Sequence, residues 1–206
     1  MKIMIPEEEF CNSHLLLQPG RPILCTTKNE DGSDHVAPFS WVNPVSSKPP
    51  MLALALLNEP KKQHSLVNIE RTGEFVINLP DIDIADSLVL SSYKTKFGEN
   101  KFERSGFTRL PSVKVEPPGI MECRAHLECK VSDTIVTGDH ILLIANIIYA
   151  QYDEEAFSPS LLINLDKYKP AIHLQNFNLN SSQIHMFMAS GGAHITEVAF
   201  PKKEES

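Results

Sequence analysis

The polar stretch from Asp31 to Pro50 holds the residues best suited to contact a ligand. It reads DGSDHVAPFSWVNPVSSKPP and contains the only tryptophan of the chain, Trp41. Large aromatic side chains usually lie among apolar neighbours, whereas hydroxyl and amide groups flank this indole. A rigid loop with hydroxyls, an amide and one large flat ring suits a flat, phosphorylated ligand. The alternative is a surface loop with a half-buried tryptophan; the flanking polar residues are Ser40, Asn43, Ser46 and Ser47.

A hairpin is expected to carry the start of this stretch. Residues 23–27, ILCTT, are apolar or β-branched and predict a strand. Asp31-Gly32 predicts the turn, because glycine accepts the positive φ that a tight hairpin needs. The return strand HVAPFSW contains Pro38, which cannot donate to a ladder, so this strand is expected at a sheet edge or at a bulge.

The next segment is expected to place a short helix between two strands. Residues 51–57, MLALALL, form a continuous apolar run between prolines and predict a fully buried strand. A helix is expected to begin at His64 and to stop at Gly73. The residues EFVINLP that follow predict another strand.

Three further segments of this half carry weaker signals. Residues 6–19 are expected to be an irregular lead-in. Helical spacing over 83–90 predicts a second helix, with Asp81 or Asp83 as its cap. The polar segment 98–107, GENKFERSGF, is expected to be rich in turns and to begin with a helical turn.

The second half of the chain is expected to be mostly β. Apolar and polar residues alternate over 120–131, IMECRAHLECKV, which predicts a half-exposed strand. Residues 133–152 are expected to begin with a turn and continue as a long buried strand, and 161–174 to hold a strand segment. Many short strands with two interspersed helices predict a closed or partly closed β-barrel.

Composition sets limits on the class of protein. A length of 206 residues fits one domain, or one domain with a tail, and the net charge of -7 argues against a nucleic-acid or membrane-binding surface. The N-terminus lacks the apolar region of a secretory signal, so a cytoplasmic protein is expected. The four cysteines are scattered without a CxxC pair, so free thiols and no metal site are expected.

The ordered set of motifs resembles the flavin reductase-like family, which includes the flavoredoxins. The resemblance runs through RPILCTT, DG, HVAPFSWVNPVSSKPPMLALAL and HSLVNIERTGEFVINLP. It continues with KFERSGFT, PPGIMECRAHLECKV and GDHILLIANI, and covers residues 19–172. The resemblance implies a mainly β fold, an FMN-binding split β-barrel that is Greek-key-like with a few short helices. It also implies a homodimer with the flavin near the subunit interface.

FMN requires a site for its phosphate. Ser65 stands at the start of the expected helix, where free N–H groups and the helix dipole favour an anion; the alternative is that Ser65 only caps the helix. The family often carries an arginine where this chain has Gln63, so a neighbouring lysine is expected to supply the charge. The candidates for the phosphate are Ser46, Ser47, Lys62, His64 and Ser65.

The flavin ring and its ribityl chain need stacking and hydrogen bonds. The positions that match the family are Ser40, Trp41 and Asn43, and the alternative for Trp41 is a hydrophobic plug. Lys101 matches a family lysine near the flavin, where a cation would stabilise the reduced ring. The alternatives are a solvated side chain or a role for Lys94 or Lys96 instead.

The GDH motif is a second expected anchor for the flavin. Gly138 allows a turn that places Asp139 beside His140 at the start of a strand. The resemblance places His140 at the flavin, with Asp139 either orienting the imidazole or holding the turn. His173 and Phe177 stand where the family often brings a late aromatic residue toward the ring.

The resemblance implies an NAD(P)H:flavin oxidoreductase that passes a hydride from NADH or NADPH to FMN. The alternatives are a flavoredoxin-like carrier whose FMN is reduced by an electron-transfer protein, and a non-catalytic flavin- or metal-binding module. Free flavin is a further possible acceptor. The flavin-binding domain is expected over residues 1–180, with 181–206 as a C-terminal extension.

Overall fold

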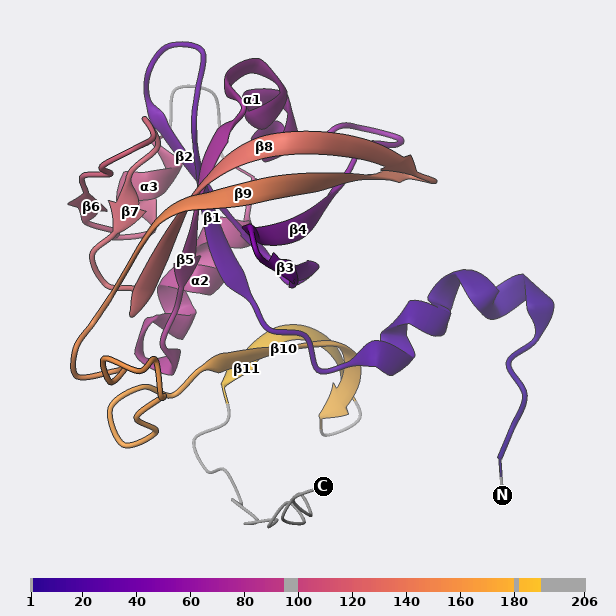
Figure 1. Cartoon of the computed structure of the whole chain (residues 1–206). Coiled ribbons are helices and arrows are strands. Elements are labelled where there is room, and N and C mark those ends of the chain that lie inside the picture. Colours follow the sequence, from indigo (N-terminus) through magenta and orange to yellow (C-terminus); the bar gives the residue numbers. More distant parts are fainter. Residues whose placement is uncertain (1, 95–99, 180–181, 190–206) are drawn as a thin grey trace, which may run out of the picture.

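A seven-stranded antiparallel sheet forms the body of the protein (Figure 1). The computed structural model describes residues 2–94, 100–179 and 182–189, with side chains as far as Leu174. The strand order is β2-β1-β5-β8-β9-β4-β3. The strands are β1 (Ile23–Lys28), β2 (Asp34–Phe39), β3 (Val42–Ser47), β4 (Pro50–Leu57), β5 (Glu74–Leu79), β8 (Ala125–Thr137) and β9 (His140–Tyr152).

The two edge strands of this sheet are neighbours in the sequence. β2 ends at Phe39 and β3 begins at Val42, so only Ser40 and Trp41 join the two edges. Such a short link forces the sheet to curl until its edges meet, because a residue of extended chain spans only about 3.5 Å. The fold is therefore a split β-barrel, as predicted, and Ser40 and Trp41 lie at its seam.

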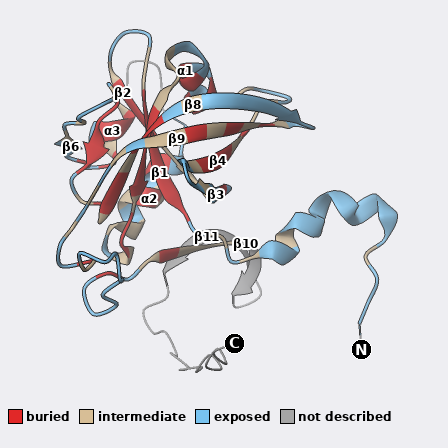
Figure 2. Cartoon of the chain, viewed as in Figure 1, coloured by how far each residue is buried: buried red, intermediate tan, exposed pale blue. Residues whose placement is uncertain are grey.

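The barrel interior holds the main apolar core. Alternate residues of β4 point inward: Leu52, Leu54 and Leu56 are buried together with side chains of β1, β5 and β9. The helix α1 (His64–Thr72) closes one end of the barrel with Leu66 and Ile69. Figure 2 shows this burial concentrated where the central strands cross.

Two short helices cover the outside of β1 and β2. These are α2 (Ala85–Ser92), which follows the 3-10 turn η2 (Ile82–Ile84), and α3 (Lys101–Arg104). Leu24 and Val36, on the outer face of the sheet, pack against Leu88 of α2 and Phe102 of α3. The strands β6 (Arg109–Leu110) and β7 (Gly119–Ile120) pair with each other beside this cluster.

Three elements project from the barrel (Figure 1). The 3-10 helix η1 (Glu7–Leu17) extends away from it and buries no residue. A two-stranded ribbon of β10 (Ala171–Leu179) and β11 (Ser182–Ala189) lies below it, and the β8–β9 hairpin reaches beyond the sheet. Residues 131–137 of β8 are almost entirely exposed (Figure 2).

Most elements expected from local signals are present. The β1–β2 hairpin turns through Gly32 at φ +81°, and β2, which contains Pro38, is an edge strand. Helix α1 ends at Gly73, whose φ of +70° is the left-handed cap that glycine favours. The Asp81 side chain caps η2 by accepting from the backbone N–H of Asp83.

Four expectations from the sequence were wrong in detail. The segment after Trp41 is the edge strand β3 and not a loop, because it pairs with β4; Pro44 is tolerated at an edge. The lead-in is the 3-10 helix η1 and not irregular. No turn begins at Asp133, since β8 runs unbroken to Thr137.

The fourth wrong expectation is the alternation of apolar and polar residues over 120–131. The strand begins only at Ala125, and both of its faces are buried as far as Cys129. The polar residues are satisfied inside: the imidazole of His126 bonds the carbonyl of Ile120, and Glu128 accepts from two backbone N–H groups. Tertiary partners therefore overrode the period-two pattern.

The expected boundary at residue 180 falls between β10 and β11, which pair as one ribbon. The end of the expected extension, residues 190–206, lies outside the described residues, as does Lys96. Within the described part of the chain, no helix is long and apolar enough to cross a membrane.

Candidate functional site

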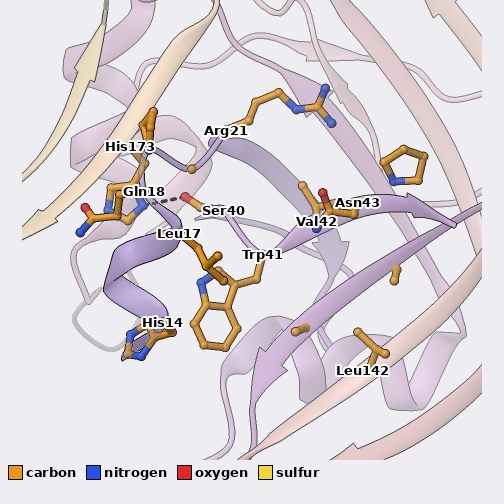
Figure 3. Close-up of a pocket in the computed structure, with 15 residues that line it drawn as sticks. His14, Leu17, Gln18, Arg21, Ser40, Trp41, Val42, Asn43, Leu142 and His173 are labelled. Atoms are coloured by element: carbon orange, nitrogen blue, oxygen red, sulfur yellow. Dashed lines mark hydrogen bonds between the residues drawn. The ribbon is translucent and has the colours of Figure 1, made fainter. Parts of the chain in front are cut away.

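A cavity of about 770 Å³ opens beside the seam of the barrel. Figure 3 shows His14 and Leu17 of the N-terminal segment beside the indole of Trp41, with Val42 and Asn43 further along the same wall. Ser40, Trp41 and Asn43, which were predicted for the flavin ring, all line it. Pockets of this size bind cofactors and drug-sized ligands in other proteins.

Small side chains make one wall of the cavity flat. Ala53 and Ala55 line the cavity from β4, with Leu142 of the adjacent strand β9 opposite Ala55 in the register. Along β4, these two alanines alternate with the leucines that fill the barrel core. A planar ring can approach the backbone of β4 closely here, because only methyl groups stand in its way.

Trp41 is held between two imidazole rings. Its indole is 45% exposed, stacks on His140 with centroids 4.7 Å apart, and meets His14 edge-on at 5.5 Å. The backbone carbonyl of Trp41 accepts from the N–H of Ala55, 3.0 Å away. The indole is therefore not a plug under a loop but a half-exposed ring fixed at the cavity edge.

Asp139 both orients His140 and holds its turn. Its carboxylate lies 2.7 Å from Nδ1 of His140, and this contact holds the pKa of Asp139 below its usual range. The carbonyl of Asp139 accepts from the N–H groups of Asn58 and Glu59. Both roles considered for Asp139 are thus present. His140 itself stacks on the indole of Trp41 and is not among the residues that line the cavity.

The β10 strand meets the seam through His173. Its Nδ1 lies 2.7 Å from Oγ of Ser40, and its backbone pairs with Gly20. His173 therefore lines the cavity. The side chain of Phe177 lies outside the described residues.

A second polar cluster consists of His35, His64 and Lys101, from β2, α1 and α3. The two imidazoles lie 4.5 Å apart at an interplanar angle of 36°. Lys101 is only 9% exposed; burial, followed by the charge of Arg104, lowers the pKa of its ammonium to about 8. Burial and the charge of Lys101 lower the pKa of His64, and they bring that of His35 to about 3.

Ser65 lies at the start of α1, directly after His64. It is 1% exposed, and its hydroxyl has no hydrogen-bond partner among the described residues. The helix N-cap is Gln63 and not Ser65, and the Gln63 side chain bonds the N–H of Leu57 without capping the helix. An unpartnered buried hydroxyl in the first turn of a helix without a side-chain cap is suited to an anion.

The other phosphate candidates are placed differently. Lys62 is 2.8 Å from Glu70 in a surface ion pair, so its charge is already compensated. Ser46 and Ser47 lie at the end of β3 away from Trp41. Lys94 is exposed, which leaves Lys101 as the buried one of the two described candidate lysines.

Sequence reasoning missed several residues that the fold brings to these sites. Ala53 and Ala55 were treated as part of a fully buried strand, although the strict alternation LALAL signals two different faces. His35 was treated as an ordinary histidine, and no local signal connects it with Lys101. His14 and Arg21 line the cavity from a segment that was expected to be irregular or unremarkable.

Comparisons with known proteins agree with this geometry. The model of the flavin reductase like domain matches residues 18–171. An uncharacterized protein of Archaeoglobus fulgidus is 34% identical over 178 residues, covering 85% of this chain and 96% of that protein. Another from Methanothermobacter thermautotrophicus is 31% identical over 156 residues, covering 74% and 71%.

Three solved structures share the fold. Nitrilotriacetate monooxygenase component B from Bacillus cereus superposes with a TM-score of 0.80 at 20% identity, covering 95% of this chain and 99% of that one. The 2-nitrobenzoate 2-nitroreductase of Pseudomonas fluorescens gives 0.79 at 22%, covering 99% of both. The flavoredoxin of Desulfovibrio vulgaris gives 0.72 at 22%, covering 90% and 93%.

Proposed function

Because the chain belongs to the flavin reductase-like domain family, we propose that it binds FMN and reduces it with NADH or NADPH. The observation that carries the proposal is the presence of two unlike sites that β4 and the start of α1 connect along the chain. A flat-walled cavity beside Trp41 suits the ring, and the His35–His64–Lys101 cluster with Ser65 suits the phosphate. Residues 55–65 connect the two, since β4 leads from Ala55 to the start of α1.

Each group of residues has a defined task in this proposal. Trp41, Ala53 and Ala55 would hold the ring, and Ser40 and Asn43 would bond its polar edge or the ribityl chain. Lys101 would neutralise the phosphate, a different role from that expected at the ring. When bound, FMN supplies the hydride acceptor, and the nicotinamide supplies the hydride. The remaining space of the cavity, next to Arg21 and His14, would admit the nicotinamide.

The test is anaerobic mixing of the FMN-loaded protein with NADH or NADPH, followed by visible absorbance. A reductase bleaches its flavin band on the timescale of turnover and consumes nicotinamide when free flavin or oxygen is the acceptor. The similarity to a flavoredoxin favours a second candidate, an electron carrier. A protein that stays oxidised with both nicotinamides, but bleaches with dithionite or a reducing protein, is that carrier and not a reductase.

The stack of His140 on Trp41 is expected to contribute to FMN affinity. His140→Ala should weaken FMN binding by roughly fivefold, or about 1 kcal/mol, because the indole loses the ring that fixes it. His140→Phe keeps a ring at this position and should retain most of the affinity. Fluorescence titration with FMN measures both, and the emission of Trp41 reports the change in its surroundings. If native protein and His140→Ala bound FMN with equal affinity, the GDH turn would have only a structural role.

We further propose that the protein is a homodimer. Apolar side chains stay exposed on the projecting β8–β9 hairpin, where Val136 is 71% and Ile135 46% exposed. Light scattering should give twice the mass of one chain, and Val136→Glu should shift it toward the monomer. Val113→Glu, at an exposed residue of the loop between β6 and β7, is the matched control and should stay dimeric. A monomeric native protein at micromolar concentration would contradict the proposal.

A further inference from the structure

The His35–His64–Lys101 cluster gathers three groups that can be cationic, and among the described residues Asp31 is the carboxylate that acts on it. The rings of His35 and His64 lie 4.5 Å apart, and the charge of Lys101 acts on both imidazoles. Arg104, on the same helix as Lys101, adds a further positive charge. Asp31, in the turn between β1 and β2, is the carboxylate that favours the charged form of His64. Like charges this close cannot all ionise, so in the ligand-free protein the cluster carries Lys101 as a cation and both imidazoles neutral.

A phosphate monoester changes this balance. Its second pKa is about 6, so it arrives at neutral pH mainly as a dianion. Lys101 compensates one of its two charges. The buried hydroxyl of Ser65 and the first-turn amides of α1 offer hydrogen bonds but no full charge. The second charge therefore raises the proton affinity of the nearest accessible imidazole.

The two imidazoles are not equivalent as proton acceptors. His35 is 6% exposed, and within the described part of the chain its pKa is set by burial, Lys101 and His64, with no carboxylate among the causes. His64 is exposed at the helix start, adjacent to Ser65, and faces Asp31. His64 is thus the group that solvent protons reach and that a carboxylate already assists.

We propose that this cluster binds the FMN phosphate together with a proton, which His64 takes up as the phosphate enters. Bound in this way, the ammonium of Lys101 and the imidazolium of His64 balance the dianion, while His35 stays neutral. The proposal rests on the proposed function, because it concerns the phosphate end of the same site. Proton uptake by His64 would make the affinity for FMN depend on pH. The affinity for riboflavin, which lacks the phosphate, would not change over the same pH range.

Calorimetry measures the proton directly. FMN is titrated into the protein at about pH 7.5, above the ordinary histidine range, in phosphate-free buffers that differ in ionisation enthalpy. The dependence of the heat on the buffer gives the number of protons exchanged. We expect uptake of roughly one proton per FMN in the native protein, and close to none for riboflavin, which lacks the phosphate.

Two variants identify the residue that takes up the proton. His64→Gln keeps a hydrogen-bonding side chain but cannot become charged, so FMN should bind with little proton uptake and roughly tenfold lower affinity. His35→Gln should preserve the uptake. In native protein, the imidazole resonance of His64, assigned with His64→Gln, should move to its protonated position on addition of FMN. This last measurement decides the question even if a variant fails to fold.

The outcomes separate this inference from the function. FMN binding without proton uptake, or uptake of about one proton that persists in His64→Gln, overturns the inference and leaves the flavin site intact. A His64 resonance that stays at its neutral position does the same. A protein that binds no FMN overturns both the inference and the proposed function.

Discussion

Lys101→Ala is expected to weaken FMN binding roughly a hundredfold, whereas Lys62→Ala changes it less than about threefold. Truncating a buried charged partner of a phosphate costs about 3 kcal/mol, and Lys101 is buried with its charge close enough to act on two imidazoles. Lys62→Ala is the matched control, because it removes the same charge from a surface ion pair with Glu70. Fluorescence titration with FMN measures the affinities.

Riboflavin separates the phosphate from the ring in this experiment. Its affinity should be nearly the same in native protein and in Lys101→Ala, because it has no phosphate for Lys101 to bind. If Lys101→Ala lost riboflavin as strongly as FMN, Lys101 would act at the ring, as first expected from the resemblance. If Lys62→Ala lost FMN and Lys101→Ala did not, the phosphate site would lie at Lys62.

The pH dependence follows from the pKa of Lys101. In the ligand-free protein this pKa is about 8, lowered by burial and by Arg104, and a bound phosphate raises it. Below pH 8 the ammonium is already present; above pH 8 binding has to recruit its proton. FMN affinity is therefore expected to fall by about tenfold per pH unit above pH 8 through this group alone. This contribution of Lys101 to the fall should be absent in Lys101→Ala.

Trp41→Ala is expected to weaken FMN binding by about 2 kcal/mol, or roughly thirtyfold. The indole is the largest ring at the cavity edge, and stacking on an aromatic side chain contributes about 1–3 kcal/mol when measured by alanine substitution. The fold should survive, because the side chain is 45% exposed and leaves no core cavity. FMN titration and the thermal unfolding midpoint measure the two effects separately.

The control for Trp41 lies on the next strand. Val45, on β3, is 52% exposed and does not line the cavity, so Val45→Ala should leave FMN affinity unchanged. Trp41→Phe keeps an aromatic ring and should recover part of the affinity. A well-folded Trp41→Ala that binds FMN as tightly as native protein would show that the indole serves the seam of the barrel and not the ligand.

Local signals predicted most elements of this fold. The left-handed glycine at the end of α1, the turn at Gly32 and the proline in an edge strand each act through one or two residues, which a sequence displays directly. Local signals gave wrong predictions where the hydrogen-bond partners of a residue come from a distant segment of the chain. His126 and Glu128 look like solvent-facing residues of a strand, and only the segments around Ile120 and Val113 bury them.

From the sequence alone came the β-rich class, the family resemblance and the choice of Ser40 and Trp41, which line the cavity at the seam. Only the tertiary structure decided which charges are available. Lys62 and Lys101 look alike as letters, but one is paired with Glu70 and the other is buried beside His35 and His64. The reason is that ion pairing and desolvation depend on neighbours from β2, α1 and α3, which closure of the barrel brings together and no spacing in the chain records.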